Sequence, residues 1–311
     1  MIAVVRYMPE YRADWDAFVA GSKNGTFLLH RSYMEYHEDR FTDHSLLFYR
    51  KGKLIALLPA NEEGQEVQSH GGLTYGGIIS DSRMKAPLML DVFEAMVAYF
   101  REQGFRKIIY KTVPHIYHRL PAEEDLYALF RHGAVLYRRD ASSVIDMAQH
   151  TGYSRQRRWE VKKAKQAGLQ VLKSEDYRRF MQIEHELLQE RHNKKPVHTA
   201  AEVALLASRF PRNIRLYIAR AGEAIMAGIL IYETATVAHC QYMGATAEGK
   251  SVGAMDVLVD HLLQTACAHK KYLNFGISTD QQGQYLNEGL IRNKESYGAR
   301  TVVHDFYELA L

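Results

Sequence analysis

The sequence lacks the features that mark membrane proteins and disulfide-rich secreted proteins. No run of about 18 apolar residues occurs, so no membrane span is predicted. Residues 1–15 carry acids and aromatics where a signal peptide needs a purely apolar core. There are two cysteines, Cys240 and Cys267, in a strand-like and a helix-like context, which is too few for a disulfide framework. We therefore expect a cytoplasmic protein.

Several short functional motifs are missing as well. There is no G-x-S-x-G, no C-x-x-C and no Walker loop. The histidine pairs His115/His118 and His185/His192 have no carboxylate or thiolate at ligand spacing, so no metal site is predicted. With seven prolines and no low-complexity tract, a disordered linker is not expected. What remains is a globular chain of 311 residues, 47% hydrophobic and 24% charged, long enough for two domains.

Charge is concentrated in one stretch, although the formal net charge is only +4. Residues 153–168 read YSRQRRWEVKKAKQAG, with six basic residues and one acid. Arg155, Arg158 and Lys162 fall at i, i+3 and i+7, on one face of a helix. Such a face attracts a phosphate-bearing partner or a nucleic acid, or it is simply a solvated surface.

The order of predicted elements occurs twice in the chain. LLFYRKGKLIA at 46–56 aligns with LYIARAGEAIM at 216–226, which places Gly52 on Gly222, and both stretches predict a β-hairpin. FRHGAVLYRRD at 130–140 aligns with ESYGARTVVHD at 295–305. Repeated element order with matching glycines indicates an internal duplication. We expect an α/β (α+β) protein with two related domains, 1–148 and 149–311, each a mixed twisted sheet flanked by helices.

The repeat unit is clearest between Val237 and Ile277. The sequence predicts a strand, then a loop that contains three glycines, a helix over 254–268 and a short strand over 272–275. A glycine loop that enters a helix offers backbone N–H groups and a positive dipole end to a phosphate. A simple turn is the alternative.

Hairpin, strand, glycine loop, helix, strand, helix and strand together resemble the GNAT acyltransferase unit. Two such units resemble the FemAB-like branch, whose members include the aminoacyl-tRNA-dependent ligases of peptidoglycan. LNEGLIRNKESYGAR at 286–300 is similar to that branch's final helix, and RRWEVKKAKQAG at 157–168 to the helix that opens its second domain. The resemblance implies transfer of an acyl group from acyl-CoA (acetyl-CoA) or aminoacyl-tRNA to an amine. The acceptor would be a small molecule or a cell-wall precursor, and no metal is implied.

The sequence also departs from the GNAT pattern. The register Lys250–Met255 keeps the central glycine of the pyrophosphate loop but begins with Lys and lacks the last small residue. The matching loop of the first domain, Gly76–Pro87, has no G-x-G/A, so only the second domain is expected to bind a donor. A long helical arm for tRNA is missing. The residues expected to bind the donor are Met243, Gly244, Lys250, Ser251, Val252, Gly253 and Ala254.

Four residues are candidates for the chemistry. Lys294 lies where the resembling family carries a functional lysine, and the tyrosine that many GNAT enzymes use as general acid would fall near this position. His239, Tyr242 and Asn274 are acid–base candidates by residue type, although each also has a structural interpretation. Strand alternation predicts that His239 and Tyr242 point to opposite faces and do not act together.

The acceptor has two candidate sites. Arg155, Arg158 and Lys162 suit an anionic acceptor. Tyr75 and Gly76 belong to the glycine-dense run SHGGLTYGG, which either contacts the acceptor or forms a bulge. An alternative function is a non-catalytic protein that recognises a phosphorylated glycan or RNA through helix 155–165. The sequence leaves the donor, the acceptor and the oligomeric state open.

Overall fold

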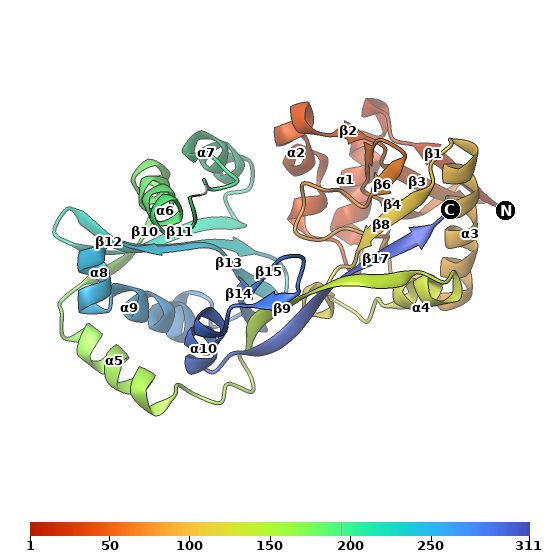
Figure 1. Cartoon of the computed structure of the whole chain (residues 1–311). Helices are drawn as coiled ribbons and strands as arrows, with labels where there is room; N and C mark the ends of the chain where they lie inside the picture. Colours follow the sequence, from red (N-terminus) through yellow and green to blue (C-terminus); the bar gives the residue numbers. More distant parts are fainter. Residues whose placement is uncertain (194) are drawn as a thin grey trace. The chain divides into compact units, whose positions relative to one another are not determined.

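The protein consists of two compact units, each with its own strands and helices (Figure 1). The computed structural model describes residues 1–193 and 195–311. Unit 1 comprises Met1–Ala141, Thr279–Tyr285 and Val303–Leu311, and unit 2 comprises Ser142–Ser278 and Leu286–Val302. The two expected domains are consecutive along the sequence, whereas the last strand of the observed chain returns to unit 1.

Unit 1 has two sets of paired strands, in the orders β1-β3-β4-β7 and β17-β8-β6-β5-β2. Its elements are β1 (Ile2–Arg6), η1 (Pro9–Tyr11), α1 (Arg12–Gly21), η2 (Phe27–Leu29), α2 (Arg31–Met34), η3 (Glu35–Arg40), β2 (Thr42–Asp43), β3 (Leu46–Arg50), β4 (Lys53–Leu58), β5 (Asn61–Glu63), β6 (Glu66–Gln68), β7 (Ile79–Ser80), α3 (Ala86–Glu102), β8 (Lys107–Lys111), η4 (His115–Tyr117), α4 (Glu124–Arg131) and β15 (Thr279–Asp280). Strands β9 (Val135–Asp146), β16 (Tyr285–Leu286) and β17 (Arg300–Ala310) each contribute residues to both units.

The core of unit 1 forms where α3 and α4 cover the strands. Pro87 in the first turn of α3 fits a helix start, where its missing N–H is not needed. Val92, Phe93 and Met96 follow at helical spacing and are fully buried against β3, β4 and β8. The helix therefore forms for the reason that the apolar spacing predicts.

Unit 2 has one main set of strands, in the order β10-β11-β12-β13-β14-β9. Its elements are α5 (Arg155–Lys165), β10 (Gln170–Ser174), α6 (Tyr177–His192), α7 (Ala200–Arg209), β11 (Ile214–Ala221), β12 (Ala224–Glu233), β13 (Val237–Ala245), α8 (Ala247–Val252), α9 (Ala254–His261), a π-helical turn η5 (Leu262–Ala266), β14 (Tyr272–Ile277) and α10 (Glu288–Ser296). Helices α6 and α7 cover one face of this sheet, and α8 and α9 cover the other (Figure 1).

The duplicated hairpins are present in both units, as β3–β4 and β11–β12. Each contains a β-bulge, with Ile55 as the extra residue in unit 1 and Met226 in unit 2. The turns differ by one position, because Lys51-Gly52 forms the first turn and Gly222-Glu223 the second. The predicted mixed α/β fold with a repeated hairpin is confirmed, while the alignment of Gly52 on Gly222 is one residue out of structural register.

The expected glycine loop of unit 2 is largely helical. Thr246 Oγ1 accepts a hydrogen bond from Gly249 N at 3.0 Å and caps α8, which begins at Ala247. A Cβ at Gly249 would lie 2.0 Å from the carbonyl oxygen of Met226, the bulged residue of β12. Gly253, at φ 74°, then separates α8 from α9. The predicted loop over three glycines is thus wrong, because Gly244 lies in β13, Gly249 lies inside α8 and Gly253 ends α8.

Candidate active site

The central feature of unit 2 is a pair of neighbouring strands that separate. β13 and β14 are parallel and pair only through Val237–His239 and Tyr272–Asn274. Immediately afterwards Gln241 forms a bulge against β12, because Tyr242 pairs with Leu230 while Cys240 pairs with Ile231. A bulge bends and twists its strand. Beyond it, in the described part of the chain, the edge of β13 toward β14 has no strand partner, and we call this unpaired interval between the two strands the gap.

In unit 1, backbone occupies the position that corresponds to the gap in unit 2. β6 pairs with β8 and β7 pairs with β4, so these two short strands replace a single long strand, and residues 69–78 leave the sheet between them. The buried Lys111 ammonium donates hydrogen bonds to the carbonyls of His70, Gly71 and Leu73 at 2.8–3.0 Å. Backbone therefore occupies this place in unit 1, which makes the unpaired interval in unit 2 the candidate place for a ligand between strands.

A buried carboxyl group lies beside the gap in unit 2. Glu184 on α6 is 5% exposed, and among the residues that the structure describes its Oε1 has no hydrogen-bond partner. Burial raises the pKa of Glu184 to about 7. A carboxyl group with a pKa near neutral is suited to accept and release a proton at physiological pH.

Two paired glycines bring Glu184 close to the sheet. Gly228 on β12 and Gly244 on β13 are cross-strand partners. A Cβ at Gly228 would lie 2.4 Å from the Phe180 ring, and one at Gly244 would lie 2.6 Å from Glu184 Oε1. Because Phe180 and Glu184 are four residues apart, they occupy one face of α6, which rests directly on the two glycines. Gly244 thus serves close packing within a strand and is not part of a turn.

Tyr242 and His198 form a hydrogen-bonded pair on this side of β13. The Tyr242 hydroxyl lies 2.7 Å from His198 Nδ1 and accepts a hydrogen bond from His198 N at 3.2 Å. Burial raises the pKa of Tyr242 to about 12, and the Glu184 charge adds to the shift. Neither Glu184 nor His198 was predicted from the sequence as a site residue.

Because of the bulge, the side chain of His239 lies on the same face of β13 as that of Tyr242. Ala238 and Cys240 pack in the core below the sheet, and so do Met243 and Ala245, because the extra residue Gln241 restarts the alternation. His239 and Tyr242 are therefore on the same face, opposite to that core. The prediction that they point to opposite faces is wrong, since it assumed a regular strand.

Lys294 and Asn274 fix the far side of the gap. The buried Lys294 ammonium donates to the carbonyls of Gly276 and Ile277 at 2.9 and 2.7 Å and to Ser278 Oγ at 3.0 Å. Burial lowers the pKa of Lys294 to about 8, so the group still carries its proton at pH 7. Asn274 Oδ1 accepts hydrogen bonds from Ser142 Oγ and from Gly276 N, both at 2.7 Å. These contacts hold β14 in place, so both residues act by positioning the strand.

The expected donor residues separate into two groups. Met243 and Gly244 lie on the part of β13 that borders the gap. Lys250, Ser251 and Val252 are in α8, and Gly253 and Ala254 follow at the junction with α9. Lys250 N bonds to Thr246 O at 2.9 Å and Gly253 N to Lys250 O at 3.3 Å. The N–H of Gly253 is therefore used within the helix, while binding of a donor phosphate by Ser251, Val252 and Ala254, the last at the start of α9, stays a prediction.

The expected acceptor residues also separate. Arg155, Arg158 and Lys162 are exposed on α5, so their role toward an anionic acceptor stays a prediction. Tyr75 is 2% exposed, with its hydroxyl 3.0 Å from Thr26 Oγ1. A Cβ at Gly76 would lie 2.0 Å from the carbonyl oxygen of Ser69. Contact of Tyr75 and Gly76 with an acceptor therefore does not fit their burial within unit 1.

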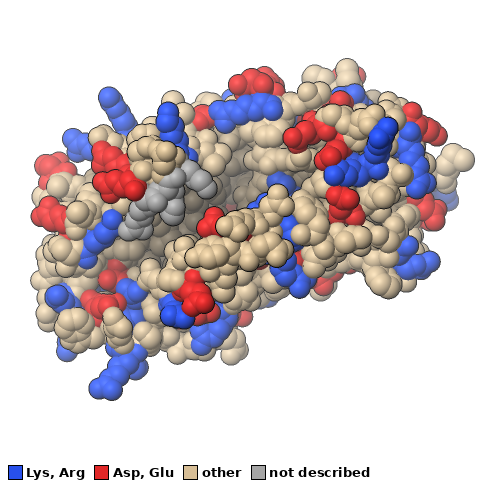
Figure 2. Space-filling model, in the orientation of Figure 1, with Lys and Arg blue, Asp and Glu red and all other residues tan. Residues whose placement is uncertain are grey.

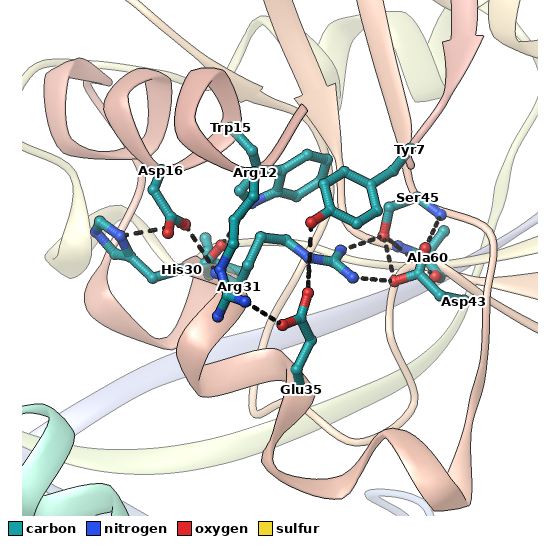
Figure 3. Close-up of polar contacts among 11 residues, drawn as sticks. Tyr7, Arg12, Trp15, Asp16, His30, Arg31, Glu35, Asp43, Ser45 and Ala60 are labelled. Carbon is teal, nitrogen blue, oxygen red and sulfur yellow. Dashed lines mark hydrogen bonds and ion pairs between the residues drawn. The ribbon is translucent and has the colours of Figure 1, made fainter. Parts of the chain in front are cut away.

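Unit 1 contains a separate polar cluster around Arg31 (Figure 3). The Arg31 guanidinium lies 3.7 Å from the centre of the Tyr7 ring and donates to Glu35 at 3.0 Å, Asp43 at 2.8 Å and Ser45 Oγ at 3.2 Å. Tyr7, Arg31, Glu35 and Asp43 border a pocket of about 430 Å³. The guanidinium already has a partner on each of its nitrogens, which indicates a structural role for this cluster.

Two further properties bear on the kind of site. Over residues 1–193 and 195–311, no group of three or more His, Cys, Asp or Glu side chains is placed to hold a metal ion. In the same residues, none of the helices is both long enough and apolar enough to span a bilayer.

Comparisons with known proteins agree with this geometry. The family model of the acetyltransferase (GNAT) domain matches residues 151–283. No curated protein matches the chain in sequence. Among solved structures, FemX has a TM-score of 0.71 at 11% identity, covering 99% of this chain and 97% of its own. L-PGS from Bacillus licheniformis has a TM-score of 0.62 at 13% identity, covering 96% and 91%.

A tandem GNAT protein from the clavulanic acid biosynthesis pathway is similar over 100% of this chain and 98% of its own, at 13% identity and a TM-score of 0.51. At such identities the likeness shows the fold, and it covers both units. Residues 151–283 thus match the acetyltransferase (GNAT) domain in sequence, and the chain as a whole has a fold similar to FemX and to the tandem GNAT protein.

Proposed function

We propose that unit 2 transfers an acyl group from acyl-CoA to an amine, with Glu184 as the general base. The observation that carries this proposal is the buried Glu184 carboxyl group, whose Oε1 has no hydrogen-bond partner among the described residues, beside the gap between β13 and β14. A base near pKa 7 is what an amine acceptor requires, because an ammonium group is not nucleophilic until it loses a proton.

The proposed reaction uses the gap to hold the thioester. The unpaired edge of β13 near Met243 and Gly244 offers backbone N–H groups to the thioester oxygen as negative charge develops there. Glu184 takes the proton from the amine nitrogen while the C–N bond forms, and the C–S bond then breaks. The departing thiolate takes a proton from Tyr242 or from water. His239 and the Tyr242–His198 pair would border the acceptor.

Two features favour acyl-CoA over aminoacyl-tRNA as the donor. The family model that matches this domain is that of acetyltransferases. Helices α6 and α7 have 16 and 10 residues, too short for an extended arm along a tRNA. The acceptor is assigned only as an amine, whether on a small molecule or on a cell-wall precursor.

The test is an assay of thiol release from acetyl-CoA in the presence of a panel of amines, with the full chain. Cys240 and Cys267 do not interfere with a thiol reagent, because both are buried and burial raises the pKa of Cys267 to about 12. We expect release that depends on the amine. A parallel assay offers aminoacyl-tRNA. If neither donor is consumed with any amine, the non-catalytic binding function is favoured instead.

A further inference from the structure

Helix α5 (Arg155–Lys165) has an inward face that fixes its orientation. Val161 and Ala164 are 5% and 2% exposed. Arg157 points the same way, with its guanidinium bonded to Asp256, Asn293 and Ser296 Oγ and 4.2 Å from the centre of the Tyr297 ring. Arg157, in the first turn of this helix, is therefore a structural anchor, and the opposite face of α5 points outward.

The outward face carries unpaired cations around an exposed indole ring. Trp159 is 63% exposed, and the Lys163 ammonium lies 5.5 Å from the ring centre. Within the described part of the chain, Arg155, Arg158 and Lys162 have no carboxylate partner. Glu160, the one acid of the helix, is turned to Arg157 instead. Lys and Arg side chains stand out from the surface over α5 at the lower left of Figure 2.

This combination is unfavourable for a surface that faces only water. Like charges at helical spacing repel one another, and a large exposed indole ring gains nothing from hydration. An interfacial helix has the same composition, because cations attract anionic head groups while tryptophan sits at the boundary between head groups and acyl chains. A bilayer surface satisfies both kinds of side chain at once.

We propose that the outward face of α5 docks on an anionic lipid surface. The face is defined by Arg155, Arg158, Trp159, Lys162 and Lys163. The cations attract anionic head groups by charge complementarity. The indole ring among them favours a lipid surface over a soluble polyanion, because a polyanion would contact only the cations. This inference does not depend on the acyl transfer proposed for unit 2.

Vesicle binding by the full chain tests the proposal. Vesicles of phosphatidylglycerol with phosphatidylcholine are compared with vesicles of phosphatidylcholine alone, by co-sedimentation and by tryptophan emission. Of the two tryptophans, Trp15 is fully buried and Trp159 is exposed, so a change in emission reports on α5. We expect binding only to the anionic vesicles, weakened by salt, with a blue shift that Trp159→Phe abolishes.

Charge reversal provides the matched comparison. Arg158→Glu/Lys162→Glu is expected to weaken vesicle binding at least about 10-fold, since each cation near the surface contributes roughly 5-fold. Arg178→Glu/Arg212→Glu, with the same change in net charge at two exposed positions of unit 2, is expected to leave binding within about 2-fold. Equal binding to both vesicle types, or equal loss in both variants, overturns the proposal. Tighter binding to a single-stranded RNA oligonucleotide than to vesicles overturns it in favour of nucleic acid.

Discussion

Replacing Glu184 with Gln is expected to lower kcat for acyl transfer by about 100-fold or more. The amide has nearly the same shape as the carboxyl group but cannot take a proton from the amine, and general bases typically contribute at least this factor. Binding of acyl-CoA should change little, because Glu184 lies on α6, on the acceptor side of the proposed site. The measurement is amine-dependent thiol release, together with the dissociation constant of acyl-CoA.

The pH dependence of the same reaction provides a second readout. With the pKa of Glu184 raised to about 7, kcat/KM of the natural protein should rise with pH through about 7, and this rise should be absent in Glu184→Gln. Because the pKa of Glu184 in the folded state is above the ordinary 4.5, the free energy of unfolding falls as the pH rises from about 4.5 to 7. Above pH 7 this loss of stability is complete. At pH 8 the Gln variant should therefore be more stable than the natural protein, by about 1–3 kcal/mol.

The matched control is Glu186→Gln on the same helix, where the side chain is exposed and bonds to Gln182. We expect natural activity and natural stability from it. A second variant, Gly244→Ala, displaces Glu184 without removing its charge, since the added Cβ would meet Oε1. It should lower kcat while the far-UV spectrum stays native. If Glu184→Gln retains full activity, Glu184 is not the base.

Replacing Arg31 with Met should destabilise unit 1 by about 2–4 kcal/mol. Arg31 is 3% exposed, and its loss leaves the carboxylates of Glu35 and Asp43 without their main cation. Breaking a buried ion pair on one side costs about 3–5 kcal/mol, and partial exposure of both acids reduces this. Urea unfolding measured through Trp15, which lies beside Arg31, reports on unit 1 when Trp159 is replaced by Phe.

Two comparisons separate the loss of the ion pairs from loss of side-chain volume. Arg6→Met removes the ion pair of a much more exposed arginine with Glu62 and should cost less than about 1 kcal/mol. Adding Glu35→Gln and Asp43→Asn to Arg31→Met should recover part of the stability, because the uncompensated charges are then gone. An effect of Arg31→Met no larger than that of Arg6→Met would contradict the structural role of the cluster.

The order of elements was predictable because it depends on local signals. Alternating apolar residues around Lys51-Gly52 and Gly222-Glu223 indicate two hairpins, and repetition of that order indicates the duplicated fold. The candidate active site depends on features that are not local. The bulge at Gln241 changes which side chains share a face of β13, and it is visible only in the pairing with β12. Helix α8 begins inside the expected loop after the Thr246 cap, and its Gly249 lies against Met226 of β12, a contact between residues far apart in the sequence.

One feature of the sequence indicates that Glu184 is unusual. It lies four residues after Phe180 and three before Leu187, at the spacing of the apolar face of α6, and a charged residue there is unusual. That signal cannot tell a surface residue at the edge of the apolar stripe from a buried carboxyl group. Glu184 is buried because the glycine pair on β12 and β13 lets α6 lie directly on the sheet. The sequence does not show which residues of the two strands pair.

Hydrogen–deuterium exchange with and without saturating acyl-CoA tests most directly where the donor binds. If the donor enters between β13 and β14, exchange should slow in peptides that cover 240–245 and 275–277, whose backbone borders the gap. Peptides that cover 69–78 should be unchanged, because that segment occupies the equivalent place in unit 1. Protection at 69–78, or unchanged exchange at 240–245 while acyl-CoA is bound, would contradict a donor site in unit 2.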